Sequence, residues 1–129
     1  MNHNYGLENM IFQDFVEVYG LDSFDVSMMA FEVFTVNSSS EFAIRKFILK
    51  YEEKTMIQML LWAKSENEHV RRLASEGSRL RLPWAVALPV FKEDPTSVVE
   101  ILELLKDDVS AYVRKSVANN LNDISKDNP

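Results

Sequence analysis

An internal repeat constrains the fold of this 129-residue chain more than any other feature of its sequence. Residues 55–64 align with residues 97–106 at a shift of 42 positions, and both segments end in a lysine. One residue is inserted before the next match, in which His69-Val70-Arg71-Arg72 aligns with Tyr112-Val113-Arg114-Lys115. A fainter copy stands upstream at Ala43-Ile44-Arg45-Lys46. Such a chain builds its structure by repeating one unit.

The repeated unit is predicted to be a pair of helices. Apolar residues recur at spacings of three and four along most of the chain, and no segment of five or more residues alternates as a half-buried strand does. Helix pairs that repeat with a period of about 40–47 residues are typical of HEAT and armadillo-like arrays. We therefore predict an all-α protein, a fragment of a HEAT/armadillo-like α-solenoid (alpha-alpha superhelix). The predicted helices cover residues 7–19, 22–36, 41–51, 53–64 and 84–92, and two more begin near residues 97 and 112.

The repeat also predicts where its central Val-Arg motif lies. Each helix pair of a solenoid has one face too apolar to stand alone, and the next pair covers it. The apolar residue of the motif is therefore expected to point inward. The arginine after it is expected either at the edge of the concave face or in an ion pair with an acidic residue of a neighbouring turn.

The composition excludes several kinds of chemistry. The chain has no cysteine, and its two histidines, His3 and His69, fall on different predicted elements. Disulfides, a thiolate nucleophile and Cys-ligated zinc are thereby excluded, and a His-based metal site or catalytic triad is disfavoured. No apolar run approaches the roughly 18 residues of a membrane span, and the N-terminus lacks the basic start of a signal peptide. We expect a cytoplasmic protein without membrane contact.

The net charge of −6 is unevenly distributed. Residues 1–40 hold six acidic residues and no lysine or arginine, whereas residues 41–129 hold 14 acidic and 14 basic residues. We therefore predict an acidic N-terminal helical segment, residues 1–37, followed by the helical repeats of residues 38–129. Because the second part is formally neutral, the acidic total does not exclude a nucleic-acid partner.

The most basic stretch is residues 71–81, with four arginines and one glutamate. The planar guanidinium of arginine gives paired donors that suit phosphate. Ion pairs with Glu66, Glu68 and Glu76 within the helix and its turns explain the same spacing equally well.

Three further residues stand out by their positions. Trp84 follows a proline at the start of a predicted helix, where a tryptophan is ordinarily a core or cap residue. Glu41 opens a helix, where its carboxylate complements the helix dipole. Asp123 lies near the end of the last helix, where the dipole disfavours a carboxylate. Asp123 is therefore the acidic residue with the weakest structural explanation.

Three segments together resemble the AlkC branch of the AlkD/AlkC-like, HEAT-like repeat DNA alkylation-repair glycosylases. They are Glu68–Ala85, Tyr112–Asp127 and the upstream motif Ser40–Arg45. The resemblance covers about residues 38–129, and residues 1–37 lie outside it.

The resemblance implies a DNA N-glycosylase that acts, as a monomer and without metal or cofactor, on alkylated double-stranded DNA. Members hydrolyse the glycosidic bond of cationic bases of the 3-methyladenine and 3-methylcytosine type. Carried over by motif, Asp123 and Glu41 are the functional carboxylates, and Trp84 is the aromatic residue at the lesion. The residues expected to contact DNA phosphates are Arg71, Arg72, Arg79, Arg81, Arg45, Arg114 and Lys115.

The sequence departs from the family pattern at three positions. Lys46 replaces a usual proline, Leu80 interrupts a usual Arg-Pro-Arg string, and Asn120 replaces a usual histidine three residues before Asp123. Family members also continue with further helical repeats beyond the position of Pro129, so the array is expected to be truncated here. The missing repeats, the replaced histidine and the net negative charge favour an alternative, a catalytically silent HEAT-like adaptor that binds DNA or protein. The glycosylase requires Glu41, Trp84 and Asp123 on one concave face.

Overall fold

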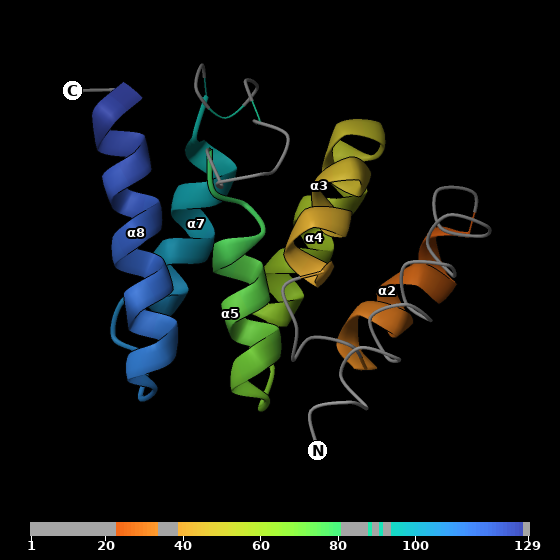
Figure 1. The fold of residues 1–129 in the computed structure, drawn as a ribbon, viewed down its shortest axis with the longest axis horizontal. Coiled ribbons are helices and arrows are strands. Elements are labelled where there is room, and N and C mark those ends of the chain that lie inside the picture. The colour runs from red at the N-terminus through yellow and green to blue at the C-terminus, as the bar shows by residue number, and fades with distance from the viewer. Residues whose placement is uncertain (1–22, 34–38, 81–87, 89–90, 92–93, 128–129) are drawn as a thin grey trace.

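The computed structural model describes residues 23–33, 39–80, 88, 91 and 94–127. All regular secondary structure in this part of the chain is helical, and it contains no strand (Figure 1). Its helices are α2 (Phe24–Val33), α3 (Ser39–Lys50), α4 (Glu52–Trp62), α5 (Glu68–Glu76), α7 (Thr96–Leu105) and α8 (Ala111–Asp127). They confirm the predicted all-α class. The helices predicted at residues 7–19 and 84–92 lie outside the described residues, apart from Leu88 and Phe91.

Local capping explains where α5 begins and ends and where α8 begins. The side chain of Asn67 accepts a hydrogen bond of 2.8 Å from the backbone N–H of His69 at the start of α5. Gly77 ends that helix, and its N–H bonds to the carbonyl of Leu73 at 2.8 Å. At the start of α8, the Ser110 hydroxyl accepts from the N–H of Val113 at 3.4 Å. These are the side-chain caps that unsatisfied N–H groups at helix starts favour.

The helices pack in two layers. α4 lies against α7 in one layer, and α5 lies against α8 in the other, with α3 packed on both α4 and α5. Figure 1 shows the succession, from α2 through the α3–α4 pair to α5, α7 and α8. α4 and α7 contain most of the two aligned segments, residues 55–64 and 97–106, and α5 and α8 begin at the two Val-Arg motifs. Equivalent helices therefore stack on one another, which confirms the repeat and the α-solenoid.

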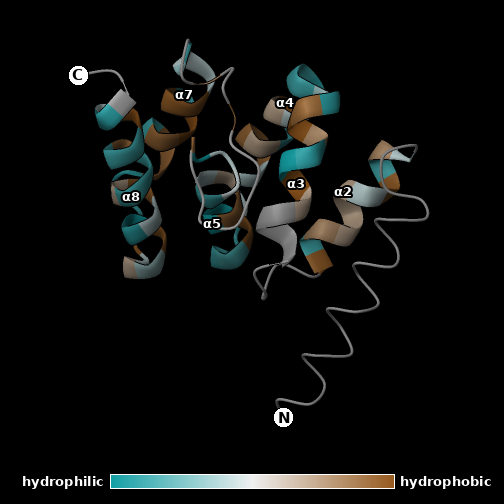
Figure 2. Ribbon diagram, turned by 45° about the horizontal axis from the view of Figure 1, so that its top comes forward, coloured by the Kyte–Doolittle hydropathy of each residue, from teal (hydrophilic) through white to brown (hydrophobic). Residues whose placement is uncertain are grey.

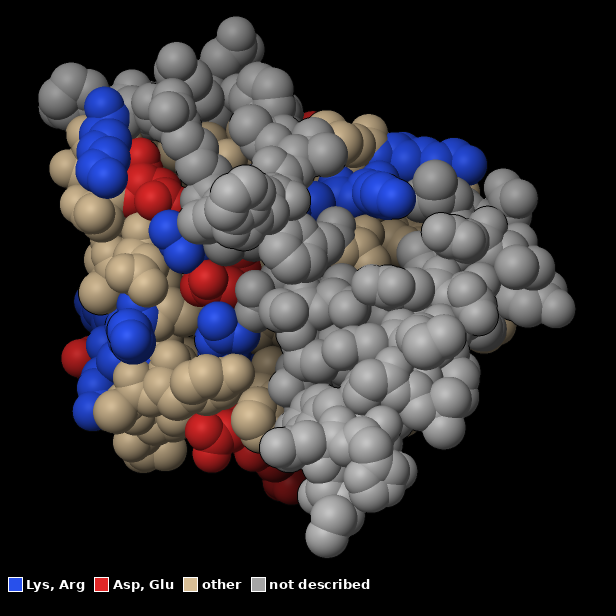
Figure 3. Space-filling view, in the orientation of Figure 1, with Lys and Arg blue, Asp and Glu red and all other residues tan. Residues whose placement is uncertain are grey.

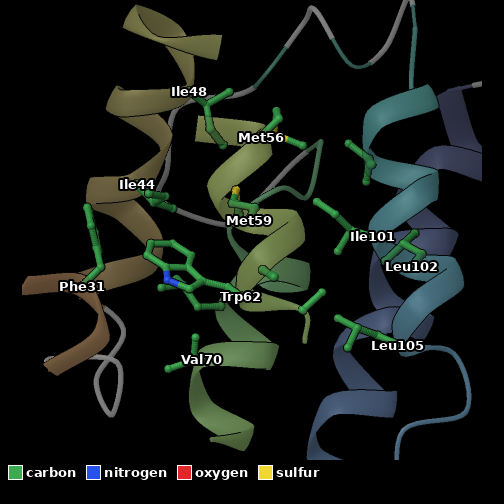
Figure 4. Packing of buried hydrophobic residues seen from close by; sticks show 14 of the residues in the cluster. Phe31, Ile44, Ile48, Met56, Met59, Trp62, Val70, Ile101, Leu102 and Leu105 are labelled. Carbon is green, nitrogen blue, oxygen red and sulfur yellow. The ribbon is translucent and has the colours of Figure 1, made fainter. Parts of the chain in front are cut away.

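The core lies between the layers. Buried apolar residues from every described helix form one cluster, which includes Phe31, Ile44, Met59, Trp62 and Ile101 (Figure 4). In Figure 2, α7 is mainly hydrophobic, whereas α8 is largely hydrophilic. Among the described helices, α7 packs against α4, α5 and α8, and α8 packs mainly against α5 and α7.

The apolar residues of the repeated motif point into this core, as predicted. Val70 is 3% exposed, and Val113 and the upstream Ile44 are fully buried. α2, which belongs to the predicted acidic segment, also joins the core. The ring of Phe31 makes an edge contact with Phe47, and the indole N–H of Trp62 donates to Glu32 at 3.0 Å. The predicted boundary at residues 37 and 38 lies outside the described residues and stays a prediction.

No helix in the described ranges is both long and apolar enough to span a bilayer.

Candidate active site

Asp123 lies on α8 and is held by Arg79, which follows the end of α5. The Nε of Arg79 donates to Oδ2 of Asp123 at 2.8 Å, and Nη2 donates to Oδ1 at 3.2 Å. Asp123 is only 8% exposed. This fork-to-fork geometry fixes the plane of the carboxylate as well as its position. The acidic residue that the helix dipole disfavours therefore has a specific basic partner in the neighbouring repeat.

A second buried carboxylate, Glu76, shares the same arginine. Nη1 of Arg79 donates to Oε2 of Glu76 at 3.0 Å, and Arg72 approaches that oxygen to 3.7 Å. The other oxygen, Oε1, accepts from the hydroxyl of Ser116 on α8 at 2.7 Å. Ion pairing with Glu76 was one of the two explanations that the sequence left open for the basic stretch, and the structure shows these ion pairs. Its place beside Asp123 was not predicted, because that place depends on how α5 and α8 pack.

Arg45 of α3 completes the charged cluster from inside the molecule. It is fully buried, and it donates to the carbonyl oxygens of Gly77 at 3.2 Å and Leu80 at 3.3 Å. Its guanidinium is directed to the protein backbone and not to a surface that DNA could reach. This placement does not support the predicted phosphate contact of Arg45.

The two arginines respond to this environment in opposite ways. Burial and the nearby charge of Arg79 lower the pKa of Arg45 to about 10, against the effect of Asp123 and Glu76. Burial alone would also lower the pKa of Arg79. The hydrogen bonds to Asp123 and the charge of Glu76 outweigh burial, so the pKa of Arg79 is raised. Both groups are therefore cations at neutral pH.

Asn120, the residue in place of the usual histidine, lies one helical turn before Asp123. It is fully buried, and its Nδ2 donates to the carbonyl of Ser75 at 2.8 Å and to the hydroxyl of Ser78 at 3.4 Å. Its Oδ1 is buried without a partner among the described residues. Asn120 thus joins α8 to α5 and makes no hydrogen bond to Asp123.

The arginines of the Val-Arg motif connect neighbouring turns through hydrogen bonds. Arg71 donates to Asp108 from Nε at 2.8 Å and from Nη2 at 3.1 Å, and to the carbonyls of Ser65 and Glu66, each at 3.0 Å. Arg114 donates to the carbonyl of Asp108. Of the two predicted roles for Arg71, the ion pair with the acid of a neighbouring turn is confirmed. Burial would raise the pKa of Asp108, but the hydrogen bond from Arg71 lowers it below the ordinary value.

The other predicted contacts differ in accessibility. Arg114 and Lys115 are exposed on α8, and Arg72 lies over the ring of Tyr112 at 4.8 Å from its centroid. Figure 3 shows acidic and basic side chains interleaved on the side of the molecule where α5 and α8 lie.

Two predicted residues, Trp84 and Arg81, lie outside the described residues. Glu41 lies in the first turn of α3, but its side chain is outside the described part. The structure thus brings Asp123 together with Arg79 and Arg45, and the predicted grouping with Trp84 stays a prediction.

A metal site is not formed by the described residues, since no three of their His, Asp and Glu side chains are grouped to hold an ion. The cluster instead offers a buried, oriented carboxylate with spare acceptor positions. Arg79 occupies one acceptor position on each oxygen of Asp123, and each oxygen has a second. Such a group can accept a proton from water or stabilise a nearby positive charge.

Comparison with known proteins agrees with this arrangement. The model of the DNA alkylation repair enzyme family matches residues 31–129. The uncharacterized protein YhaZ of Bacillus subtilis is 57% identical over 127 residues, which are 98% of this chain and 36% of YhaZ. The alkylpurine DNA glycosylase AlkC of Pseudomonas fluorescens, solved with DNA containing an abasic site analog, superposes with a TM-score of 0.87 at 51% identity.

The superposition covers 94% of this chain and 34% of AlkC, so the chain spans about a third of the length of these relatives. The family match nevertheless extends over most of the chain, and the charged cluster around Asp123 falls within the matched residues. The chain belongs to the DNA alkylation repair enzyme family, in its AlkC branch.

Proposed function

We propose that this chain belongs to a DNA N-glycosylase that removes cationic alkylated bases of the 3-methyladenine and 3-methylcytosine type from double-stranded DNA. The observation that carries the proposal is the buried carboxylate of Asp123, held in a fixed plane by Arg79. The family match and the likeness to an alkylpurine DNA glycosylase support it.

The chemistry suits a site that relies on carboxylates. The oxygen of water forms a bond to C1′ of the deoxyribose while the bond from C1′ to the base nitrogen breaks. The bonding electron pair goes to the base, which leaves as a neutral molecule because it began as a cation. The leaving group therefore needs no general acid.

Positive charge develops on the sugar as the base departs. The carboxylate of Asp123 stabilises that charge and accepts the proton of the attacking water. Glu41 is the second carboxylate of the proposal. Trp84 faces the cationic base or sugar, since tryptophan has the strongest cation–π face.

DNA binding in this proposal depends on cations that remain accessible. Arg114 and Lys115 are exposed, Arg72 is half-buried, and Arg81 is assigned by the motif. Arg79 acts on Asp123 and not on a phosphate, because its donors already reach two carboxylates. The proposed protein works as a monomer in the cytoplasm.

The test is base release from methylated duplex DNA by the full-length protein and its Asp123→Asn variant. We expect the variant to be slower by roughly 100-fold or more, the loss typical of removing one group that stabilises transition-state charge. Asp107→Asn is the matched control, because Asp107 is an exposed acid in the turn before α8. Equal rates for the wild type and Asp123→Asn would refute the role of Asp123.

A wild-type protein that binds DNA without releasing any base would instead be an adaptor. That is the alternative favoured by the replacement of the usual histidine by Asn120.

A further inference from the structure

The backbone on both sides of Arg79 is held from α3. Arg45 bonds to the carbonyl of Gly77, two residues before Arg79, and to the carbonyl of Leu80, one residue after it. Beyond the end of α5, the chain around Arg79 is held by two backbone hydrogen bonds, from the N–H of Arg79 to the carbonyl of Glu76 at 3.3 Å and from the N–H of Leu88 to the carbonyl of Leu80 at 3.2 Å. The guanidinium of Arg45 adds two further donors to this segment from α3.

Ile44, the residue before Arg45, also fixes the end of α5, by close packing against Gly77. A Cβ atom added to Gly77 would lie 2.7 Å from Cγ2 of Ile44 and 2.8 Å from the carbonyl oxygen of Leu73. Only glycine allows α3 to approach the end of α5 this closely. Ile44 and Arg45 thus fix the segment 77–80, the first by contact and the second by hydrogen bonds.

A buried arginine at this position needs a physical reason. Removing a guanidinium from water carries a desolvation penalty, and an apolar side chain of similar volume is often at least as stabilising. Its lowered pKa, about 10, reflects this burial. The partners that offset the penalty are Gly77 and Leu80 by hydrogen bonding and Asp123 and Glu76 by charge.

We propose that Arg45 is a positioning residue that sets the orientation of Asp123 by fixing the chain segment from which Arg79 reaches it. Arg45 does not touch DNA; it acts through the carbonyls of Gly77 and Leu80 on Arg79, and Arg79 acts on Asp123. Glu41 lies four residues before Arg45 on the same helix. Arg45 therefore also fixes the helix that carries one carboxylate relative to the helix that carries the other. The inference rests on the proposed glycosylase function.

The experiment compares Arg45→Met and Arg45→Lys with the wild type in the full-length protein. One measurement is the single-turnover rate of base release from methylated duplex DNA with enzyme in excess. The second is the Kd for a duplex containing an abasic site analog. We expect Arg45→Met to lower the rate by roughly 10- to 100-fold, because small displacements of a reacting group have effects of this size. Arg45→Lys is expected to lower it less, and Kd is expected to stay within about twofold.

Thr55→Val is the matched control. Thr55 is also fully buried and donates from its hydroxyl to a backbone carbonyl, that of Phe47 at 3.0 Å, but it lies on α4, in the other layer from Asp123. We expect it to lower the thermal unfolding temperature while the single-turnover rate of the folded protein is unchanged. A merely structural role for Arg45 would give the same pattern in Arg45→Met, and that result would overturn the proposal.

Two other results would also overturn it. A weaker Kd with an unchanged rate would make Arg45 a DNA-contact residue. If Arg45→Met does not fold, the test is made with Arg45→Lys. If that variant has the wild-type rate or also fails to fold, Arg45 serves stability alone.

A readout that needs no activity separates this inference from the proposed function. The Nε–H group of Arg79, hydrogen-bonded to Asp123, gives its own NMR signal, and its hydrogen exchange reports the pair directly. We expect faster exchange in Arg45→Lys and unchanged exchange in Thr55→Val. If the wild type released no base, the glycosylase proposal would fail. The exchange result would still decide whether Arg45 positions Arg79 and Asp123.

Discussion

Two arginine–aspartate pairs in this molecule have nearly the same geometry and different surroundings. Arg71 meets Asp108 with an Nε–Oδ2 distance of 2.8 Å, and Arg79 meets Asp123 at the same distance. The side chains are also similarly buried, with exposures of 14% and 8% in the first pair and 15% and 10% in the second. Neither distance nor burial distinguishes the two.

Their remaining partners distinguish them. Asp108 also accepts from the N–H of Ser110, and the other donors of Arg71 reach carbonyls of its own turn. Asp123 accepts only from Arg79 among the described residues, and Arg79 is shared with Glu76. The Arg71–Asp108 pair, the outer pair, links two turns of the fold. The Arg79–Asp123 pair, the inner pair, presents a carboxylate with unused acceptor positions. The same two residue types can therefore serve the fold at one place and the chemistry at another.

The largest expected effect concerns stability, where the outer pair should matter more. Asp108→Asn leaves Arg71 without its carboxylate, and we expect the free energy of unfolding to fall by about 3 kcal/mol, the lower end for breaking a buried pair. Asp123→Asn should lower it less, because Arg79 keeps Glu76. Urea unfolding of both variants measures the difference.

For the rate of base release we expect the opposite order. Asp123→Asn should be the slower variant, and Asp108→Asn should be as fast as the wild type per folded molecule. If Asp108→Asn slows base release as much as Asp123→Asn does, the two pairs do not differ in function.

A smaller effect is expected from acid. The pKa of Asp108 is lowered in the folded protein relative to the unfolded chain, where it is about 3.9. Its contribution to stability is therefore complete above the unfolded-state pKa and is lost as the pH falls through the folded-state pKa. Unfolding free energies measured from pH 6 downward should decline less steeply below about pH 4 in Asp108→Asn than in the wild type. Parallel profiles would show that the outer pair is not a source of acid sensitivity.

The smallest effect is expected at an exposed cation that belongs to neither pair. Lys115 forms no ion pair with the described residues, unlike Arg71 and Arg79. If it contacts a phosphate, Lys115→Ala should reduce the slope of log affinity against log salt concentration by about 0.9. Stability should be unchanged.

Lys106→Ala is the control, because Lys106 lies at the end of α7 in the other layer and pairs with Glu103 at 2.9 Å. An equal change of slope in both variants would mean that the protein senses general charge and not a DNA contact on α8.

The upstream copy of the repeated motif shows where sequence reasoning stopped. Arg45 aligns with Arg71 and Arg114, so the repeat predicted the same surroundings for all three. The motif does fix that the apolar residue before each arginine is buried. It does not fix what lies opposite the arginine, because that depends on the neighbouring helix. At Arg71 the neighbour is a turn with an aspartate, and at Arg45 it is the end of α5.

Helical periodicity and the repeat by themselves determined the all-α solenoid and the inward valines, because these follow from local spacing and from stacking equal units. The aspartate on α8 could also be singled out, since it opposes the helix dipole. Only the tertiary structure decided that Arg79 and Glu76 surround it and that Arg45 is buried behind them. The contacts of Arg45 with Gly77 and of Arg79 with Asp123 join residues 32 and 44 positions apart, and only the packing of α3, α5 and α8 brings them together.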